Sequence, residues 1–520
     1  MSARDSYDAV VIGAGHNGLA CAWHLARARK RVLVLERRHV VGGAAVTEEF
    51  APGFRNSAAS YTVGLLAPDI IRAMDLHGHG LRIVQRPYAN FLPTDDGRYL
   101  LTGGGQTREA VARFSQHDAD ALPEYERRLG AVAALLRDVA DRVPPAAGAG
   151  GLLRAIGQGR RALRLGDAAR RDALDLFTRS AREVLDGFFR SDSLKAVLGF
   201  DAVVGNYASP DTPGSAYVLL HHVFGETNGV PGAWGHAIGG MGAITQAMAR
   251  ACEAAGVEIR TDAPVARVLS DGGRASGVEL ADGSRIAARI VAANVHPKTL
   301  LLDMVEDGAI ATPLRSRIEQ HANGSGTFRM NVALSALPRF TCLPDPGDHL
   351  AAGIILAPTL DYMDRAWLEA RAHGWSPRPI VEMLIPSMLD DSLAPPGAHV
   401  ASLFAQQFDP AIAWTPGQRD AAVEAVLDTV ERFAPGFRAL IVGQMALSPA
   451  DLHARFGLVG GDIFHGRMSL DQLWAARPVL GLGAHRMPLA GLWLCGSGAH
   501  PGGGVSGRPG RNCARAILAG

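Results

Sequence analysis

YDAVVIGAGHNGLACAWHLARARKRVLVLE, residues 7–36, is the stretch that decides the fold of this 520-residue chain. The apolar run Asp8–Ile12 predicts a buried parallel strand, and Leu19–Arg29 has the apolar spacing of a helix. A second apolar run, Arg31–Leu35, predicts another strand, which ends on Glu36. The stretch therefore predicts a strand–turn–helix–strand unit that ends on an acidic residue.

The turn of this unit carries three glycines at the spacing G-x-G-x-x-G. Gly13 permits a tight turn, Gly15 lets the backbone approach a pyrophosphate, and Gly18 lets the helix pack on the strand. The helix N-terminus offers unpaired N–H groups to phosphates, and Glu36 is placed to accept hydrogen bonds from a ribose. Glycine-rich turns alone are common, but the complete unit predicts a dinucleotide site.

Composition excludes several classes of protein. The net charge of +1 does not favour a nucleic-acid partner, and 48% hydrophobic with 20% charged residues is ordinary for a globular chain of about two to four domains. No apolar run reaches the roughly 18 residues of a membrane span, and no secretory leader precedes the first strand. Five cysteines without a C-x-x-C pair favour neither a metal site nor a disulfide framework. We therefore expect a cytoplasmic protein without a bound metal.

The remainder of the chain falls into three segments with different patterns of predicted secondary structure. Long helices are expected from about 61 to 230, alternating strands and helices over Gly239–Asn294, and a second sheet after that. Strands of that second sheet and the helix after them are predicted at Thr327–Leu334, Pro379–Pro386, His399–Phe404 and Gly417–Phe433. This order of segments predicts a discontinuous nucleotide-binding domain over residues 1–65, 232–300 and 485–520. Residues 66–231 and 301–484 are then a substrate-binding or cap domain.

A basic series lies within the predicted helices. Its members are Arg154, Arg160, Arg161, Arg164, Arg170 and Arg171, interleaved with leucines and an isoleucine. An ordinary solvated face over a buried apolar stripe is the interpretation that general frequencies favour. A peripheral contact with a membrane surface is the alternative.

The C-terminal stretch LWLCGSGAHPGGGVSGRPGRNCARAIL, residues 492–518, has the same organisation as the first. A short apolar strand enters a glycine-dense turn, and a helix begins at about Gly507 or Gly510. A strand, a glycine turn and a helix start together predict a second cradle for an anion or a polar ring. A flexible linker would not be flanked by a strand and an amphipathic helix.

Both glycine-rich stretches resemble the FAD-binding signatures of the carotenoid and retinoid oxidoreductases, a phytoene desaturase-like family of amine-oxidase-like flavoproteins. Four further blocks resemble one branch of it, the pyridine nucleotide-disulfide oxidoreductase domain-containing proteins and their bacterial relatives; they are Thr212–Gly225, Gly232–Ala249, Leu393–Phe404 and Gly457–Pro478. The resemblance implies an α/β fold in which a discontinuous, Rossmann-like FAD-binding domain carries an inserted domain of mixed sheet and helices. It implies FAD alone, since the chain has neither a cysteine pair nor a second complete nucleotide motif.

The same resemblance implies the residues that contact FAD. They are Gly13, Gly15, Gly18, Glu36, Arg38, Gly43, Ala44, Val265, Gly496, Ser497, Gly504, Val505 and Ser506. Glu36 would hold the adenosine ribose and Val265 the adenine, while the backbone of residues 504–506 would face the pyrimidine end of the flavin. Backbone donors there would stabilise the negative charge of reduced flavin.

The implied activity is that of a dehydrogenase or desaturase, which moves a hydride from a lipophilic unsaturated substrate to flavin N5. The substrate would be of isoprenoid, polyene or acyl type, and oxygen or a quinone would reoxidise the flavin. A carotenoid ketolase, a redox-neutral flavin isomerase and a non-catalytic flavin-bound partner protein remain alternatives.

Candidates for proton transfer are His222, beside His221, together with His465 and His500. Each is equally typical of a packed, hydrogen-bonded histidine. Arg329 is a further catalytic candidate, because the resemblance places it where the amine oxidases carry a lysine whose bound water faces flavin N5. An arginine at this position weakens an amine-oxidase assignment.

Overall fold

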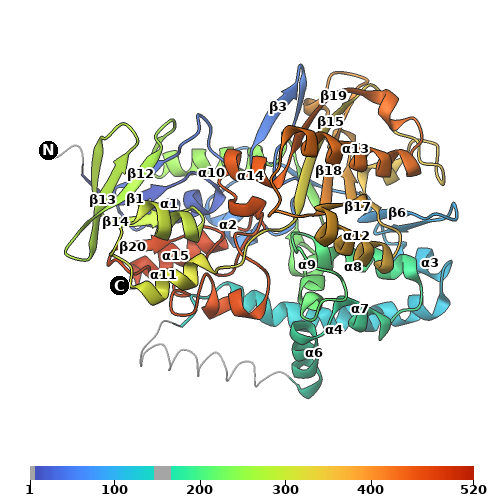
Figure 1. The fold of residues 1–520 in the computed structure, drawn as a ribbon, viewed down its shortest axis with the longest axis horizontal. Coiled ribbons are helices and arrows are strands. Elements are labelled where there is room, and N and C mark those ends of the chain that lie inside the picture. The colour runs from blue at the N-terminus through green and yellow to red at the C-terminus, as the bar shows by residue number, and fades with distance from the viewer. Residues whose placement is uncertain (1–5, 146–165) are drawn as a thin grey trace.

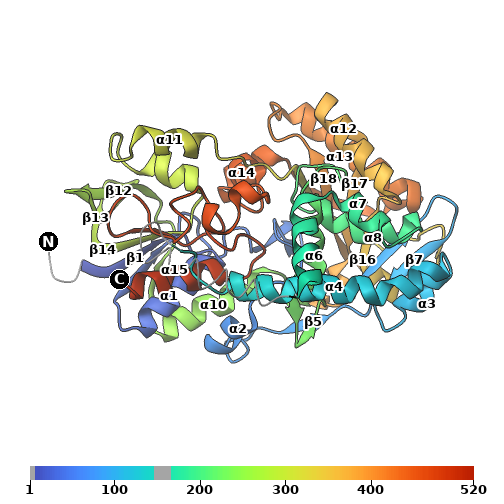
Figure 2. The same ribbon diagram turned by 90° about the horizontal axis from the view of Figure 1, so that it is seen from below.

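A computed structural model describes residues 6–145 and 166–520. Two sheets dominate it, one beside the chain termini and one in the other half of the molecule (Figure 1). Helices cover both faces of each sheet (Figures 1 and 2). Residues of both sheets line the cavity described below.

The first sheet joins three stretches that are far apart in the chain. Its order is β11-β2-β1-β14-β13-β12, with β20 beside β14. The strands are β1 (Ser6–Ile12), β2 (Val32–Leu35), β11 (Glu258–Arg260), β12 (Val265–Asp271), β13 (Arg274–Leu280), β14 (Arg285–Ala293) and β20 (Leu492–Leu494). β14 runs parallel to β1 on one side, and its other side pairs first with β13 and then with β20. The predicted strands are confirmed in all three stretches, whereas the exact domain boundaries stay a prediction.

Three helices cover one face of this sheet, namely α1 (His16–Arg27), α10 (Gly242–Ala254) and α15 (Arg508–Leu518). α11 (Thr312–Glu319) lies on the opposite face, with the sheet between the two layers (Figure 2). The apolar strands are buried on both sides, which explains their nearly continuous hydrophobic sequence. Three cysteines distant in sequence, Cys21, Cys495 and Cys513, meet in this core as buried free thiols.

The second sheet has the order β19-β15-β18-β17-β16-β6-β7. Its strands are β6 (Asn90–Pro93), β7 (Tyr99–Thr102), β15 (Thr327–Leu334), β16 (Gly353–Leu356), β17 (Trp375–Leu384), β18 (His399–Phe408) and β19 (Ile441–Leu447). The three predicted strands and the helix α13 (Pro416–Phe433) are confirmed. The expectation of helices throughout 61–230 is wrong at β5 (Ile83–Gln85), β6 and β7, because these short strands gain their stability from pairing with distant partners.

A helical layer packs on the face of the second sheet opposite α13. Its helices are α3 (Thr107–Ala112), α4 (Gln116–Ala140), α6 (Asp167–Thr178), α7 (Ala181–Asp186), α8 (Asp192–Val203) and α12 (Leu360–His373). α3 and α4 are separated at Ser115, whose side chain accepts a hydrogen bond from the Asp118 N–H and caps α4. Smaller elements complete the fold: β3 (Thr47–Ala51), β4 (Phe54–Ser57), α2 (Pro68–Ala73), α9 (His221–Phe224), β8 (Glu226–Thr227), β9 (Val230–Pro231), β10 (Gly235–Ala237) and α14 (Pro449–Phe456).

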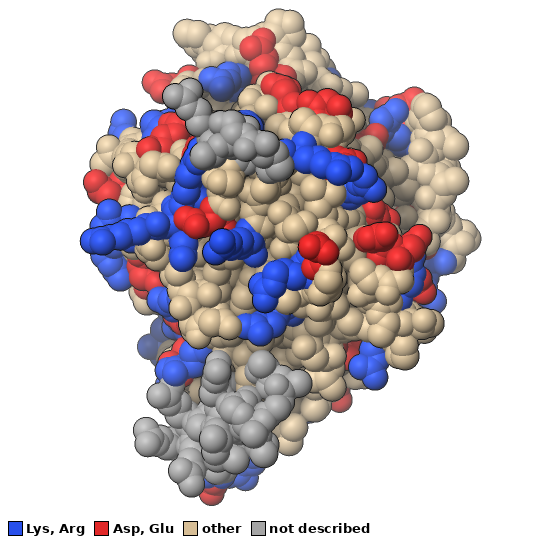
Figure 3. Space-filling view, turned by 90° about the vertical axis from the view of Figure 1, so that its left-hand side faces the viewer, with Lys and Arg blue, Asp and Glu red and all other residues tan. Residues whose placement is uncertain are grey.

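The basic series is only partly described. Arg154, Arg160, Arg161 and Arg164 lie outside the described residues. Arg170 lies on α6, where it forms an ion pair with Asp167 at 2.8 Å, and Arg171 donates to the Asp167 carbonyl. No helix in the described ranges is long and apolar enough to cross a membrane. At the end of the molecule that holds the first sheet, basic and acidic side chains are interspersed (Figure 3).

Replacing Gly510 by Ala is expected to lower the free energy of unfolding by about 2–3 kcal/mol. Gly510 brings α15 against the start of α1, and a Cβ there would lie 1.9 Å from the Asn17 carbonyl oxygen. The same substitution at Gly130, a helical glycine with open space around it, is expected to raise stability by up to about 1 kcal/mol. Urea unfolding of both variants measures the difference, and equal effects would contradict this packing.

Candidate active site

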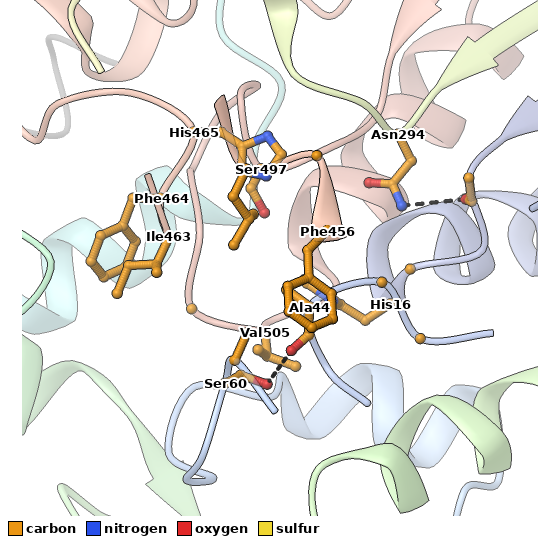
Figure 4. Close-up of a pocket in the computed structure, with 18 of the residues that line it drawn as sticks. His16, Ala44, Ser60, Asn294, Phe456, Ile463, Phe464, His465, Ser497 and Val505 are labelled. Atoms are coloured by element: carbon orange, nitrogen blue, oxygen red, sulfur yellow. Dashed lines mark hydrogen bonds between the residues drawn. The ribbon is translucent and has the colours of Figure 1, made fainter. Parts of the chain in front are cut away.

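A single cavity of about 490 Å³ is lined by both glycine-rich stretches and by the second sheet. Ten of the thirteen predicted cofactor residues line it: Gly13, Gly15, Glu36, Arg38, Gly43, Ala44, Val265, Ser497, Gly504 and Val505. The residues predicted from opposite ends of the chain therefore do converge. Figure 4 shows Ala44, Ser497 and Val505 around the same space, with a hydrogen bond from the Ser60 hydroxyl to the Ala44 carbonyl.

Glu36 ends β2 at the cavity wall and is held in place by two backbone donors. Its Oε2 accepts from the Ala14 N–H at 2.8 Å, and its Oε1 accepts from the Arg38 N–H at 3.0 Å. A carboxylate has about four acceptor positions, so two backbone bonds leave capacity for a diol. The position and the remaining hydrogen-bonding capacity of Glu36 fit the ribose role predicted for it.

The glycine turn leaves room that side chains would fill. Gly13 has φ +93°, a conformation that favours glycine, and a Cβ on Gly15 would lie 2.8 Å from Asn294 Nδ2. Gly43 lies directly against Gly15, since its added Cβ would be 3.4 Å from the Gly15 Cα. The bare backbone here forms the wall that a pyrophosphate requires.

Arg38 lines the cavity together with the glycine turn. It forms an ion pair with Glu48 and lies over the Phe456 ring, while its Nη1 is buried without a hydrogen-bond partner among the described residues. A buried guanidinium nitrogen with nothing to bind indicates a missing anionic ligand. The residues present therefore fit a diphosphate-containing cofactor.

Three predicted cofactor residues lie behind the wall instead. Gly18 packs α1 on the turn, since a Cβ there would be 2.1 Å from the Gly13 oxygen, as predicted for it. Gly496 packs against Asn294, and Ser506 is buried where its hydroxyl accepts from the Arg508 N–H at 3.2 Å. They shape the site without lining it.

Asn294 is a lining residue that sequence reasoning missed. It directly follows β14, the strand between β1 and β20, and its side-chain amide lies within hydrogen-bonding distance of the backbone of Gly13, Gly15 and Gly18. Polar residues at the carboxyl ends of parallel strands commonly face a ligand. Its position after the last apolar residue of β14 was the available signal.

Two histidines line the cavity with nitrogen atoms that have no partner among the described residues. They are His465, at Nδ1, and His16, at Nε2, and Figure 4 shows both at this site. Burial lowers the pKa of His465 to about 3 and that of His16 to about 4, so both rings are neutral at pH 7. His16, within the G-x-G-x-x-G turn, was not among the predicted candidates.

The other proton-transfer candidates lie elsewhere. His500 donates to the Val139 carbonyl at 3.0 Å and does not line this cavity, which matches the packed interpretation. The backbone of His221 and His222 lies in α9, but their side chains lie outside the described part of the structure.

Arg329 lies behind the cavity wall. The guanidinium on β15 lies under the ring of Tyr61, 4.7 Å from its centroid, and donates to the Leu403 carbonyl and to the Ser402 hydroxyl. Tyr61 and Phe404 line the cavity in its place. Arg329 therefore supports the wall and does not take the position predicted from the amine-oxidase lysine.

The part of the cavity formed with the second sheet contains polar groups that sequence reasoning also missed. Tyr61 donates its hydroxyl to Glu382 at 2.6 Å, and Arg86, Asn90 and Asp201 line the same wall. Burial raises the pKa of Glu382. The apolar lining residues nearby include Leu65, Phe200, Val204, Trp234 and Ile463. This wall therefore combines apolar surface with a buried charged cluster.

Comparison with known proteins agrees with this geometry. The profile of the flavin containing amine oxidoreductases matches residues 18–507. The chain is 40% identical to pyridine nucleotide-disulfide oxidoreductase domain-containing protein 2 of Rattus norvegicus, over 99% of this chain and 94% of the relative. It is 30% identical to the hydroxyneurosporene desaturase of Cereibacter sphaeroides, over 98% and 97%.

A solved structure of putrescine oxidase shares the fold, with a TM-score of 0.59, 16% identity and 99% coverage of both chains. The predicted α/β FAD-binding fold, the phytoene desaturase-like resemblance and the FAD cofactor are thereby confirmed. The protein is an FAD-dependent oxidoreductase, and its chain belongs to the family of flavin containing amine oxidoreductases.

Proposed function

We propose that this protein is a dehydrogenase or desaturase that takes hydride from a substrate with an extended lipophilic, unsaturated part. The observation that carries the proposal is the continuous cavity, whose lining runs from the dinucleotide turn to the apolar residues beside the second sheet. The relatives named as hydroxyneurosporene desaturase and phytoene desaturase support the reaction type. The buried charged cluster indicates that the substrate is not apolar throughout.

The cofactor would be held by the residues that line the dinucleotide part of the cavity. Glu36 would bind the ribose, and Arg38 with the Gly13–Gly15 backbone would bind the diphosphate. Gly504 and Val505 would contact the flavin edge. FAD, when bound, supplies the two-electron acceptor for the reaction. The chain's own task is then to position the donor carbon, to exclude water, and to hold the proton that leaves with the hydride.

His465 and His16 are the groups best placed to handle that proton. Each ring lines the cavity, is neutral at pH 7 and has a buried ring nitrogen without a partner among the described residues, so it can form a hydrogen bond to a bound ligand. Because burial disfavours the protonated ring, a proton taken up there would be passed on and not held. We propose oxygen or a quinone as the final electron acceptor. A peripheral membrane contact through the basic series remains a prediction.

A ketolase, an isomerase and a non-catalytic flavoprotein are separated from this proposal by one experiment. Anaerobic mixing with isoprenoid, polyene and acyl substrates is expected to bleach the oxidised flavin band and to give a product lighter by two hydrogens. In a parallel incubation under air, an added oxygen in the product would indicate the ketolase and an unchanged mass the isomerase. Failure to bleach the flavin across all three substrate classes would contradict a dehydrogenase.

Gly15→Val is expected to abolish FAD retention. The new side chain would enter the cavity beside Asn294, where the backbone must remain bare for the diphosphate. Absorbance of the purified protein measures the FAD content, with Gly417→Val, a glycine with open space around it, as the control. Stoichiometric FAD in Gly15→Val would overturn the assignment of this turn.

Acid is expected to destabilise the protein through its buried histidines. Their pKa values in the folded state lie below the usual 6.5, so the unfolded chain binds more protons as pH falls from about 6.5 towards 4. The contribution of these histidines to the free energy of unfolding is therefore full above pH 6.5 and decreases as pH falls below it. In His465→Gln the free energy of unfolding should fall less steeply with decreasing pH, by up to about 1.4 kcal/mol per pH unit. Urea unfolding between pH 6.5 and 4 measures this slope. The variant His373→Gln, at an exposed histidine, is the control and should show the same pH dependence as the parent protein.

A further inference from the structure

Arg86 is a cavity-lining cation whose hydrogen-bonding groups are largely unused. Within residues 6–145 and 166–520, its side chain donates to the Thr62 hydroxyl and forms no ion pair. A guanidinium carries five N–H donors. Burial lowers the pKa of Arg86, and the charges of Glu382 and Tyr61 offset that effect only in part.

The Glu382 carboxylate interacts electrostatically with this guanidinium but forms no ion pair with it among the described residues. Glu382 Oε2 accepts from the Tyr61 hydroxyl at 2.6 Å, and its Oε1 faces Gly353, where a Cβ would lie 2.7 Å away. Glu382 is also close to a second guanidinium, since Arg329 lies beneath the Tyr61 ring. The carboxylate is therefore shared by Tyr61 and two arginines, and Arg86 retains donors toward the cavity.

Apolar residues complete the same chamber. Phe200, Val204 and Trp234 line the cavity together with Arg86. An unsatisfied guanidinium in an apolar chamber matches a ligand with a carboxylate head and a hydrocarbon body, because guanidinium binds carboxylate with two parallel hydrogen bonds. Two carboxylates, Asp201 and Glu382, line the same wall, but Glu382 already accepts from the Tyr61 hydroxyl and lies near Arg329. Arg86 is therefore the group with donors available for an anionic head.

We propose that Arg86 binds the carboxylate of an amphipathic substrate, a long-chain or isoprenoid acid whose hydrocarbon part is the group oxidised. This inference rests on the proposed function, because it specifies the head group of the same substrate. Arg86 acts as a binding and specificity residue and takes no part in the transfer of hydride.

The test is a titration of the FAD-loaded protein with decanoate, 1-decanol and decylamine, three probes of equal chain length. Binding is followed by the shift of the flavin absorption band. Decanoate is expected to bind at least tenfold more tightly than the other two. In Arg86→Met its affinity should fall at least tenfold, to that of 1-decanol, whose own binding is unchanged.

Arg365→Met, an exposed arginine on α12, is the matched control and should bind decanoate as the parent does. If Arg86→Met does not fold with FAD, Arg86→Lys replaces it, since lysine keeps the charge but loses the paired donors and should weaken decanoate binding severalfold. Unchanged decanoate affinity in the Arg86 variant, no decanoate binding by the parent, or preference for decylamine would overturn the proposal. These outcomes are independent of flavin bleaching by substrate, which tests the dehydrogenase activity itself.

Discussion

Strand β14 is the constraint on which the rest of the structure depends. It pairs in parallel with β1 on one side and with β20 on the other, with Ile12, Ala293 and Leu494 at the same level of the sheet. The chain leaves these three strands at Gly13, Asn294 and Cys495, so both glycine turns and the Asn294 amide open at one edge. In parallel sheets, the crevice at the carboxyl ends of the strands is where ligands bind.

The second sheet supplies the opposite wall and a different chemistry. The dinucleotide side offers bare backbone, the carboxylate of Glu36 and the guanidinium of Arg38, which suits a diphosphate and a ribose. The substrate side offers aromatic and aliphatic surface around a buried cluster in which Arg86, Glu382 and Arg329 share one environment. Burying such charges is costly unless each is paired, so a cluster that leaves Arg86 short of partners is typical of a ligand site.

The parts of this account that depend on local chain chemistry were predictable from the sequence. The glycine turns, Glu36, and the apolar strands β1, β2 and β15 follow from residue spacing and apolar runs, and the structure has them where they were predicted. Arg86, Asp201 and Glu382 were not found, because isolated charged residues carry no local signal and meet only through the packing of β17, α8 and the loop after β5. Arg329 was placed at the reaction site by analogy, but the rings of Tyr61 and Phe404 stand between its strand and the cavity.

The central claim is that both ends of the chain enclose one FAD molecule, whose flavin faces the chamber beside the second sheet. A crystal structure of the purified yellow protein tests this most directly. The account predicts continuous density for FAD with its ribose at Glu36, its diphosphate between Gly15 and Arg38, and its flavin at Val505, with Arg86 on the open side. Density for the dinucleotide outside this cavity, or a flavin that points away from the second sheet, would contradict it.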